Sequence, residues 1–194
     1  VVGFLGELSL GHASFMSVGA YSGSMLSVAL LQATELPLYV RLPLAMIFGG
    51  LVAAIFGVII GVPVLRLNGD YLAIVTLAFG EIVKNVIINL DFTGGAIGYD
   101  TKPIYSTPKT LLPYAAAAVI IAVILVINLA KSKHGRAITA VRDNKIAASA
   151  TGINITYYKL MVFAFSAFIA GIAGVLWGHS LSIIKAAKFD FNMS

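Results

Sequence analysis

Five long apolar segments, separated by polar stretches, constrain this chain more than any other feature. A helix rises about 1.5 Å per residue, so about 20 apolar residues span a hydrocarbon core of about 30 Å. Hydrophobic residues make up 59% of the 194 residues, and charged residues only 11%. These values predict an all-α, polytopic membrane protein. The predicted spans are residues 9–31, 42–65, 71–90, 111–130 and 159–180.

A basic segment, residues 131–158, joins the last two spans. It contains five of the thirteen Lys and Arg residues and a single acid, Asp143. Short loops rich in Lys and Arg stay on the cytoplasmic side of a membrane, so this segment predicts a cytoplasmic connection. By alternation, the polar turn at 66–70 is also cytoplasmic, and the Gly- and Pro-rich loop at 91–110 is external.

A short surface helix is predicted inside this segment, from Gly135 to Ala150, with Gly152 as its end. Such a helix is either a rigid contact for a soluble partner or a solvated surface helix, and the pattern does not choose between them. The helix can turn three apolar residues to one side and four polar residues to the other: Ile138, Val141 and Ile146 against Arg142, Asp143, Asn144 and Lys145.

Small residues recur at helical spacing in the second and fifth spans. Small side chains let the backbone of a neighbouring helix come close, so these positions predict helix packing. Static packing is favoured over a moving contact. The packing positions are Gly49, Ala53, Gly57, Gly61, Gly171 and Gly174.

Charged and ionisable side chains inside the spans require polar partners. Glu81 and Lys84 are three residues apart, so they either neutralise each other or take part in transport. His12 either lines a path or is a hydrogen-bonded interior residue, and the second reading is favoured. Gly80 is a candidate helix break. Trp177 and His179 suit the membrane interface at the end of the last span.

Several function classes are disfavoured by composition and motifs. The net charge of +5 is gathered at segment ends, which indicates membrane orientation and no nucleic-acid partner. The chain has no cysteine, and its three histidines lie on different segments, so a zinc site is not expected. The glycine-rich stretch at 93–98 lacks the lysine of a nucleotide-binding loop. We therefore expect no enzyme, metal or cofactor site.

Four motifs carry a resemblance to a known family. They are GELSLGHASFMSVGAY at 6–21, GDYLAIVTLAFGEI at 69–82, TGG at 93–95 and GRAITAVRDNKIAA at 135–148. The chain resembles the membrane permease subunits of bacterial branched-chain amino acid ABC importers. The resemblance implies that residues 1–194 form one permease domain, incomplete at both ends, in the bacterial inner membrane.

The resemblance also implies partners and site residues. The expected partners are a second related permease, two cytoplasmic ATPase subunits, an extracytoplasmic substrate-binding protein and membrane lipid. The residues matching the family's ATPase-docking loop are Arg136, Arg142, Asp143, Asn144 and Gly152. The candidates for the translocation path, which lie in the motif-bearing spans, are Ser9, His12, Tyr71, Thr76 and Glu81.

Three alternatives stay open at this point. The first is the same importer with urea or a short amide as its cargo. The second is an ion- or proton-coupled secondary carrier that uses Glu81, His12 and Lys84 as a relay. The third is a structural membrane scaffold without transport activity.

Overall fold

The structure, a computed structural model, describes residues 3, 6, 9–34, 36–65 and 70–189. The predicted turn at 66–70 falls almost wholly outside these residues. Five helices in the described part are long and apolar enough to cross a membrane, which confirms the predicted all-α polytopic fold. They are α2 (His12–Thr34), α3 (Leu38–Val64), α4 (Asp70–Asn89), α5 (Pro108–Lys131) and α8 (Ile155–His179).

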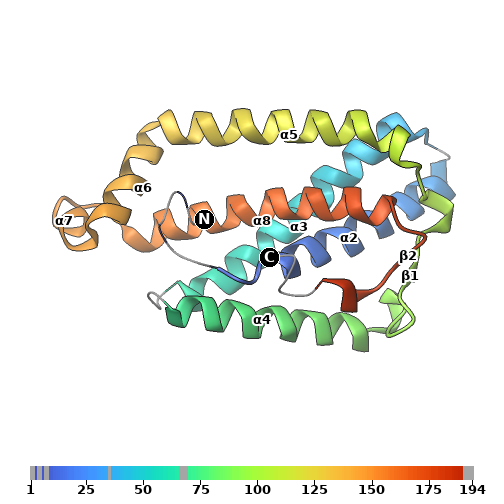
Figure 1. Cartoon of the computed structure of the whole chain (residues 1–194), viewed down its shortest axis with the longest axis horizontal. Helices are drawn as coiled ribbons and strands as arrows, with labels where there is room; N and C mark the ends of the chain where they lie inside the picture. Colours follow the sequence, from blue (N-terminus) through green and yellow to red (C-terminus); the bar gives the residue numbers. More distant parts are fainter. Residues whose placement is uncertain (1–2, 4–5, 7–8, 35, 66–69, 190–194) are drawn as a thin grey trace.

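Short elements connect these helices at the two ends of the molecule (Figure 1). At one end, α6 (Lys133–Asp143) and α7 (Lys145–Ala150) link α5 to α8. At the other end, β1 (Tyr99–Asp100) pairs antiparallel with β2 (Ile183–Ile184), with Tyr99 opposite Ile184. Three 3-10 turns complete this second end: η1 (Asp91–Thr93), η2 (Lys102–Ile104) and η3 (Ala186–Lys188).

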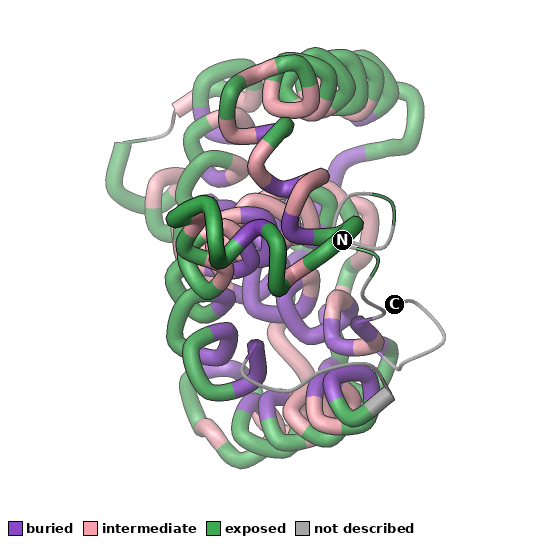
Figure 2. Tube along the Cα trace, turned by 90° about the vertical axis from the view of Figure 1, so that its left-hand side faces the viewer, coloured by how far each residue is buried: buried purple, intermediate pink, exposed green. Residues whose placement is uncertain are grey.

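Helices α2, α3 and α8 carry most of the buried residues and form the core. The buried segments gather toward the middle of the molecule (Figure 2). The backbones of these three helices meet where each contributes a glycine: Gly19, Gly49 and Gly171, called the three-glycine crossing below. A Cβ atom added to Gly171 would lie 2.8 Å from the carbonyl oxygen of Gly49, and one added to Gly49 would lie 2.8 Å from that of Gly19. A Cβ added to Gly19 would overlap the Gly171 backbone. No side chain fits between the three backbones.

The remaining small-residue positions lie along the same contacts. A Cβ on Gly57 would come within 2.7 Å of the Ala167 methyl group, and one on Gly171 within 2.6 Å of the Ala53 methyl group. Gly61 faces Leu160 and Phe163 of α8, and Gly174 abuts the backbone of α2 at Met16. The small residues of α3, from Gly49 to Gly61, therefore lie against α8, and Gly49 also contacts α2.

Helices α4 and α5 are attached more loosely. Helix α4 packs through one side, where Leu72, Thr76 and Val83 are buried, and it is continuous through Gly80, so the candidate helix break there is wrong. Helix α5 buries little of its surface and stands apart from the core along most of its length (Figure 1). The bundle thus consists of a tightly packed trio with two outlying helices.

Replacing Gly171 by alanine should destabilise the bundle by about 1–3 kcal/mol, because the added methyl group would force two backbones apart. Gly80→Ala is the matched control, since its Cβ would meet Ser14 no closer than 3.8 Å. Alanine also favours helix over glycine by about 1 kcal/mol, so the control should be neutral or stabilising. The measurement is the unfolding free energy in detergent micelles. Equal stability of the two variants would contradict the crossing's role.

Candidate functional site

The most distinctive polar structure of the described chain is the connection between α5 and α8, residues 132–152, called the α6–α7 unit below. Both of its helices begin with a side-chain cap. The Ser132 hydroxyl accepts a hydrogen bond from the Gly135 amide (3.2 Å) at the start of α6. The Asn144 side chain accepts from the amides of Ile146 and Ala147 (both 3.0 Å) at the start of α7. Side-chain oxygens at these positions satisfy amides that a helix leaves unpaired.

The prediction of one continuous helix from Gly135 to Ala150 is wrong. Asn144 has an extended backbone (φ −154°, ψ 101°), which ends α6 and begins α7 in a new direction. Gly152 lies after α7 with φ +84°, and the Ile153 amide bonds back to the Ala148 carbonyl at 3.1 Å. This left-handed residue closes α7, as glycine does after many helices.

The break at Asn144 also changes which apolar residues are buried. Ile138 and Val141 are fully buried, and Ile138 packs on Val162 of α8. Ile146 was expected on the same side, but 83% of it is exposed. Ala148 is the buried residue of α7 instead. The α6–α7 unit is therefore anchored to α8 through α6 and projects α7 outward.

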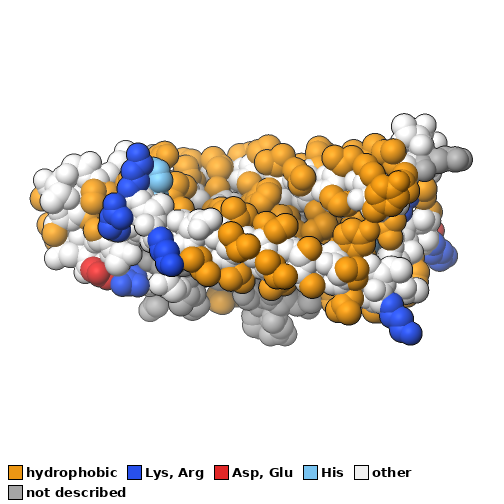
Figure 3. Space-filling model, turned by 90° about the horizontal axis from the view of Figure 1, so that it is seen from above, with side chains coloured by type: hydrophobic (Ala, Val, Ile, Leu, Met, Phe, Trp, Pro, Cys, Tyr) orange, Lys and Arg blue, Asp and Glu red, His pale blue; other side chains and the backbone are white. Residues whose placement is uncertain are grey.

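The five residues assigned to docking are all exposed on this unit: Arg136, Arg142, Asp143, Asn144 and Gly152. Arg142 pairs with the adjacent Asp143 (Nε to Oδ1, 2.9 Å) and also donates to the carbonyl oxygen of Gly3 (3.2 Å). The Arg142 side chain thus links the α6–α7 unit to the segment that precedes α2. Lys and Arg side chains gather around this end of the molecule, beyond the apolar band of the spans (Figure 3).

Three of the five path candidates lie around the start of α2. Thr76 Oγ1 accepts from the Leu10 amide (3.1 Å) and donates to the Ala73 carbonyl (3.0 Å), which ties α4 to this segment. Ser9 is buried, and its hydroxyl has no hydrogen-bond partner in the described chain. His12 Nε2 bonds Ser166 Oγ of α8 and stacks edge-on against Phe15 and Phe163. Ser166 was not predicted, because no local pattern marks a partner so distant in sequence.

The other two path candidates lie elsewhere on α4. Tyr71 is exposed at the helix start. Glu81 pairs with Lys84 at 2.7 Å, as the first of the two readings expected, and 45% of its side chain is exposed. Within the described chain, no cluster of three His, Asp or Glu side chains is placed to hold a metal ion.

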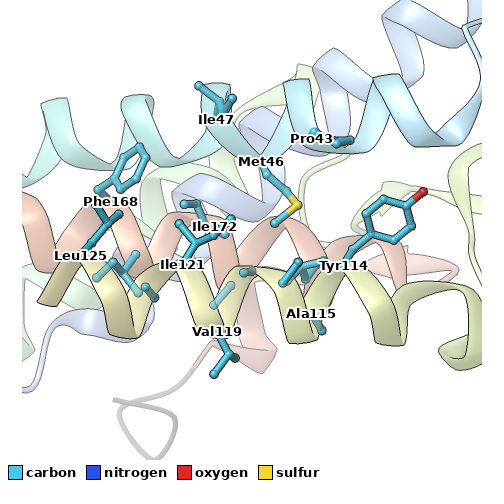
Figure 4. Close-up of a pocket in the computed structure, with 16 residues that line it drawn as sticks. Pro43, Met46, Ile47, Tyr114, Ala115, Val119, Ile121, Leu125, Phe168 and Ile172 are labelled. Carbon is cyan, nitrogen blue, oxygen red and sulfur yellow. The ribbon is translucent and has the colours of Figure 1, made fainter. Parts of the chain in front are cut away.

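Within the part of the chain that the structure describes, two cavities border α5. The larger, about 490 Å³, lies between α3, α5 and α8 and has side chains such as Met46, Ile121 and Phe168 on its walls, with no charged residue among them (Figure 4). The smaller, about 360 Å³, lies between α5 and α8, with the start of α2 beside it. His12 and Ser166 supply its polar wall, and Val126 and Ile169 are among its apolar residues. The smaller cavity therefore has a histidine and a serine in its lining, whereas the larger one is apolar apart from Tyr114.

His179 is the last residue of α8, and its side chain points into the protein. It is fully buried, with Nδ1 2.9 Å from the Val175 carbonyl and Nε2 2.9 Å from the Ser27 hydroxyl. A carbonyl only accepts, so Nδ1 carries a proton, and the Ser27 hydroxyl is the partner of Nε2. Both ring nitrogens are satisfied, which is what allows burial. Trp177, by contrast, keeps partial exposure.

Comparisons with known proteins agree on one family. The whole chain, residues 1–194, matches the family described as branched-chain amino acid transport system, permease component. It is 35% identical to the high-affinity branched-chain amino acid transport system permease protein LivM of Salmonella typhimurium and 34% identical to that of Escherichia coli, in both cases over 98% of this chain and 50% of the relative. It is 28% identical to the ribose import permease protein RbsC of Haemophilus influenzae, over 91% of this chain and 53% of that protein. The chain spans about half the length of these relatives, and no solved structure matches it.

Replacing Asn144 by alanine should fray α7, because the amides of Ile146 and Ala147 lose their acceptor. A lost helix cap costs about 1 kcal/mol, so hydrogen exchange of these two amides should become about fivefold faster. Asn144→Asp keeps the acceptor and should exchange like the parent. Asn154→Ala, which removes the cap of α8 instead, should leave the α7 amides unchanged. Unaltered exchange in Asn144→Ala would contradict the cap's role.

Proposed function

Because this chain belongs to the branched-chain amino acid transport permease family, we propose that it forms the membrane-spanning part of an ATP-driven importer that moves branched-chain amino acids into the cytoplasm. Family membership confirms the resemblance seen in the four sequence motifs and makes the chain a multi-pass inner-membrane protein and a transport subunit. The match over the entire chain is the observation that carries the proposal.

The α6–α7 unit is the proposed contact with the ATPase. It supplies a rigid, capped and basic projection at one end of the bundle, and the positive-inside rule favours the cytoplasm for that end. The proposed importer contains two such ATPase subunits, a second related permease and an extracytoplasmic substrate-binding protein. Residues 1–194 are then part of one permease domain.

Alternating access is the proposed mechanism, with α5 as the element that moves. The α6–α7 unit joins α5 to α8, so a displacement of α7 by the ATPase acts on both helices. Helix α8 is held in the three-glycine crossing, whereas α5 buries little surface. Moving α5 therefore breaks fewer contacts, and it changes the width of both cavities that border α5.

The smaller cavity is the proposed passage for the cargo in this half of the protein. A zwitterionic amino acid with an aliphatic side chain needs both polar and apolar surface, since a buried charge without a partner costs several kcal/mol. His12 and Ser166 supply polar groups, and α5 and α8 supply an apolar wall. The lining of the larger cavity is apolar apart from Tyr114, so it offers such a cargo less polar surface.

Other cargoes and mechanisms remain as outcomes of the tests. One relative is named as a ribose permease, so ribose belongs beside urea and short amides in a competition assay against leucine uptake. A proton-coupled carrier would lose transport with an uncoupler while tolerating ATP depletion. Of the three residues of the suggested relay, Glu81 and Lys84 pair with each other, whereas His12 bonds Ser166. A scaffold would show no uptake at all.

The double variant Arg142→Ala, Asp143→Ala should lose ATP-dependent leucine uptake, because it removes both the basic contact and the link to Gly3. The assay is uptake by the complete importer in proteoliposomes, with membrane insertion checked separately. The matched control is Asp100→Ala, Lys102→Ala, an exposed acid and base from the loop at the opposite end. Normal ATP-dependent uptake by the first variant would count against the proposal.

Cysteine labelling tests the proposed orientation. The 194 residues contain no cysteine, so a single introduced thiol is unique within them. Asn144→Cys should resist a membrane-impermeant maleimide added to intact cells and react after the membrane is opened. Ile97→Cys, exposed on the 91–110 loop, should react in intact cells. The reverse labelling pattern would invert the topology and remove the ATPase assignment.

A further inference from the structure

Ile146 has the most exposed large apolar side chain in the part of the chain that the structure describes. Most other exposed large apolar residues lie on the spans, but Ile146 lies on α7. Burying an isoleucine side chain is favourable in water, so an exposed one at a fixed position is suited to insertion into a partner.

The exposure of Ile146 follows from the fold of the α6–α7 unit. Asn144 interrupts the helix, and its side-chain oxygen accepts a hydrogen bond from the Ile146 amide at 3.0 Å. Helix α7 therefore starts anew at Asn144 and does not continue the buried face of α6. Ala148 takes the inward position on α7. Gly152 closes the other end of α7. Ile146 is therefore held outward by caps on both sides.

The position of α7 favours a protein partner over lipid. The spans run along the long axis of the molecule, and α7 lies at its extreme end, beyond α5 and α4 (Figure 1). Ile146 therefore projects past the apolar band that the bilayer covers. Exposed basic residues, among them Arg136 and Arg142, lie on the adjoining helix, so the complementary surface is an apolar pocket with an acidic rim.

We propose that Ile146 is the apolar anchor of the contact with the ATPase subunit, seated in such a pocket and aimed there by Asn144. This inference rests on the proposed function. Asn144 acts as a positioning residue, while Ile146 makes the contact itself. Among interface residues a few buried anchors carry most of the binding energy, and their truncation weakens binding by about tenfold or more.

The test measures binding of the importer's ATPase subunit to the membrane subunits in nanodiscs. Ile146→Ala should weaken binding about tenfold to a hundredfold, whereas Ile146→Leu should keep most of the parent's affinity. Ile97→Ala is the control, because Ile97 is 79% exposed but lies at the opposite end of the bundle. Asn144→Ala should weaken binding and Asn144→Asp should not, since the aspartate keeps the cap.

A second readout separates protein contact from lipid contact. A fluorophore sensitive to polarity, attached to Ile146→Cys, should shift to shorter wavelength only when the ATPase is added. A shift in nanodiscs without the ATPase would assign Ile146 to the bilayer and overturn the inference. Equal ATPase binding by the parent, Ile146→Ala and Ile146→Asp would also overturn it while leaving the importer function intact. Failure of the parent itself to bind the ATPase would remove both proposals.

Discussion

The three-glycine crossing of α2, α3 and α8 is the contact on which the rest of the structure depends. In a bilayer, lipid tails are as apolar as leucine side chains, so helices gain little by hiding apolar surface from each other. Their cohesion comes from close van der Waals packing, which requires backbones to approach. Gly19, Gly49 and Gly171 permit that approach at one level of the membrane, and the buried stripe of α3 extends it along α8.

This packing determines which parts of the chain are free to respond to a partner. Helix α5 contributes no backbone to the crossing and buries little surface, yet it is covalently joined through α6 and α7 to α8. The α6–α7 unit is fixed to α8 by Ile138 and Val162. In the proposed mechanism, a force applied to α7 acts on one helix that is firmly held and on another that is not, so α5 is the helix expected to move.

The spans could be predicted from sequence because their signal is local. A run of about 20 apolar residues has few alternatives in a membrane, and each predicted span overlaps an observed helix. The ends were less predictable, since α8 begins four residues earlier than expected, at Ile155, where Asn154 caps it. The small residues at Gly49 and Gly57 predicted close helix packing, but they did not identify α8 as the partner, because the sequence of one helix face does not specify which helix packs on it.

The α6–α7 unit shows the limit of pattern arguments more sharply. Good helix formers on both sides of Asn144 favour one helix, yet the asparagine is itself a strong cap, and the side chain's two hydrogen bonds decide in favour of a break. That single residue moves Ile146 from the buried side to the exposed side. The apolar side predicted for a continuous helix is then wrong for Ile146, whereas Ala148, seven residues after Val141, is still buried.

Polar residues inside the spans follow the same logic. The sequence states that His12 and His179 need partners, because an unsatisfied imidazole is costly in an apolar interior. It does not state that Ser166 and Ser27 supply them, since both serines lie on other helices, more than a hundred residues away in the chain. A serine in a span is an ambiguous signal, because it can also bond its own helix, as Ser22 does to the Val18 carbonyl. Only the packing set by the three-glycine crossing decides which serines reach across, and it is therefore the glycines that determine where the polar groups of this membrane protein meet.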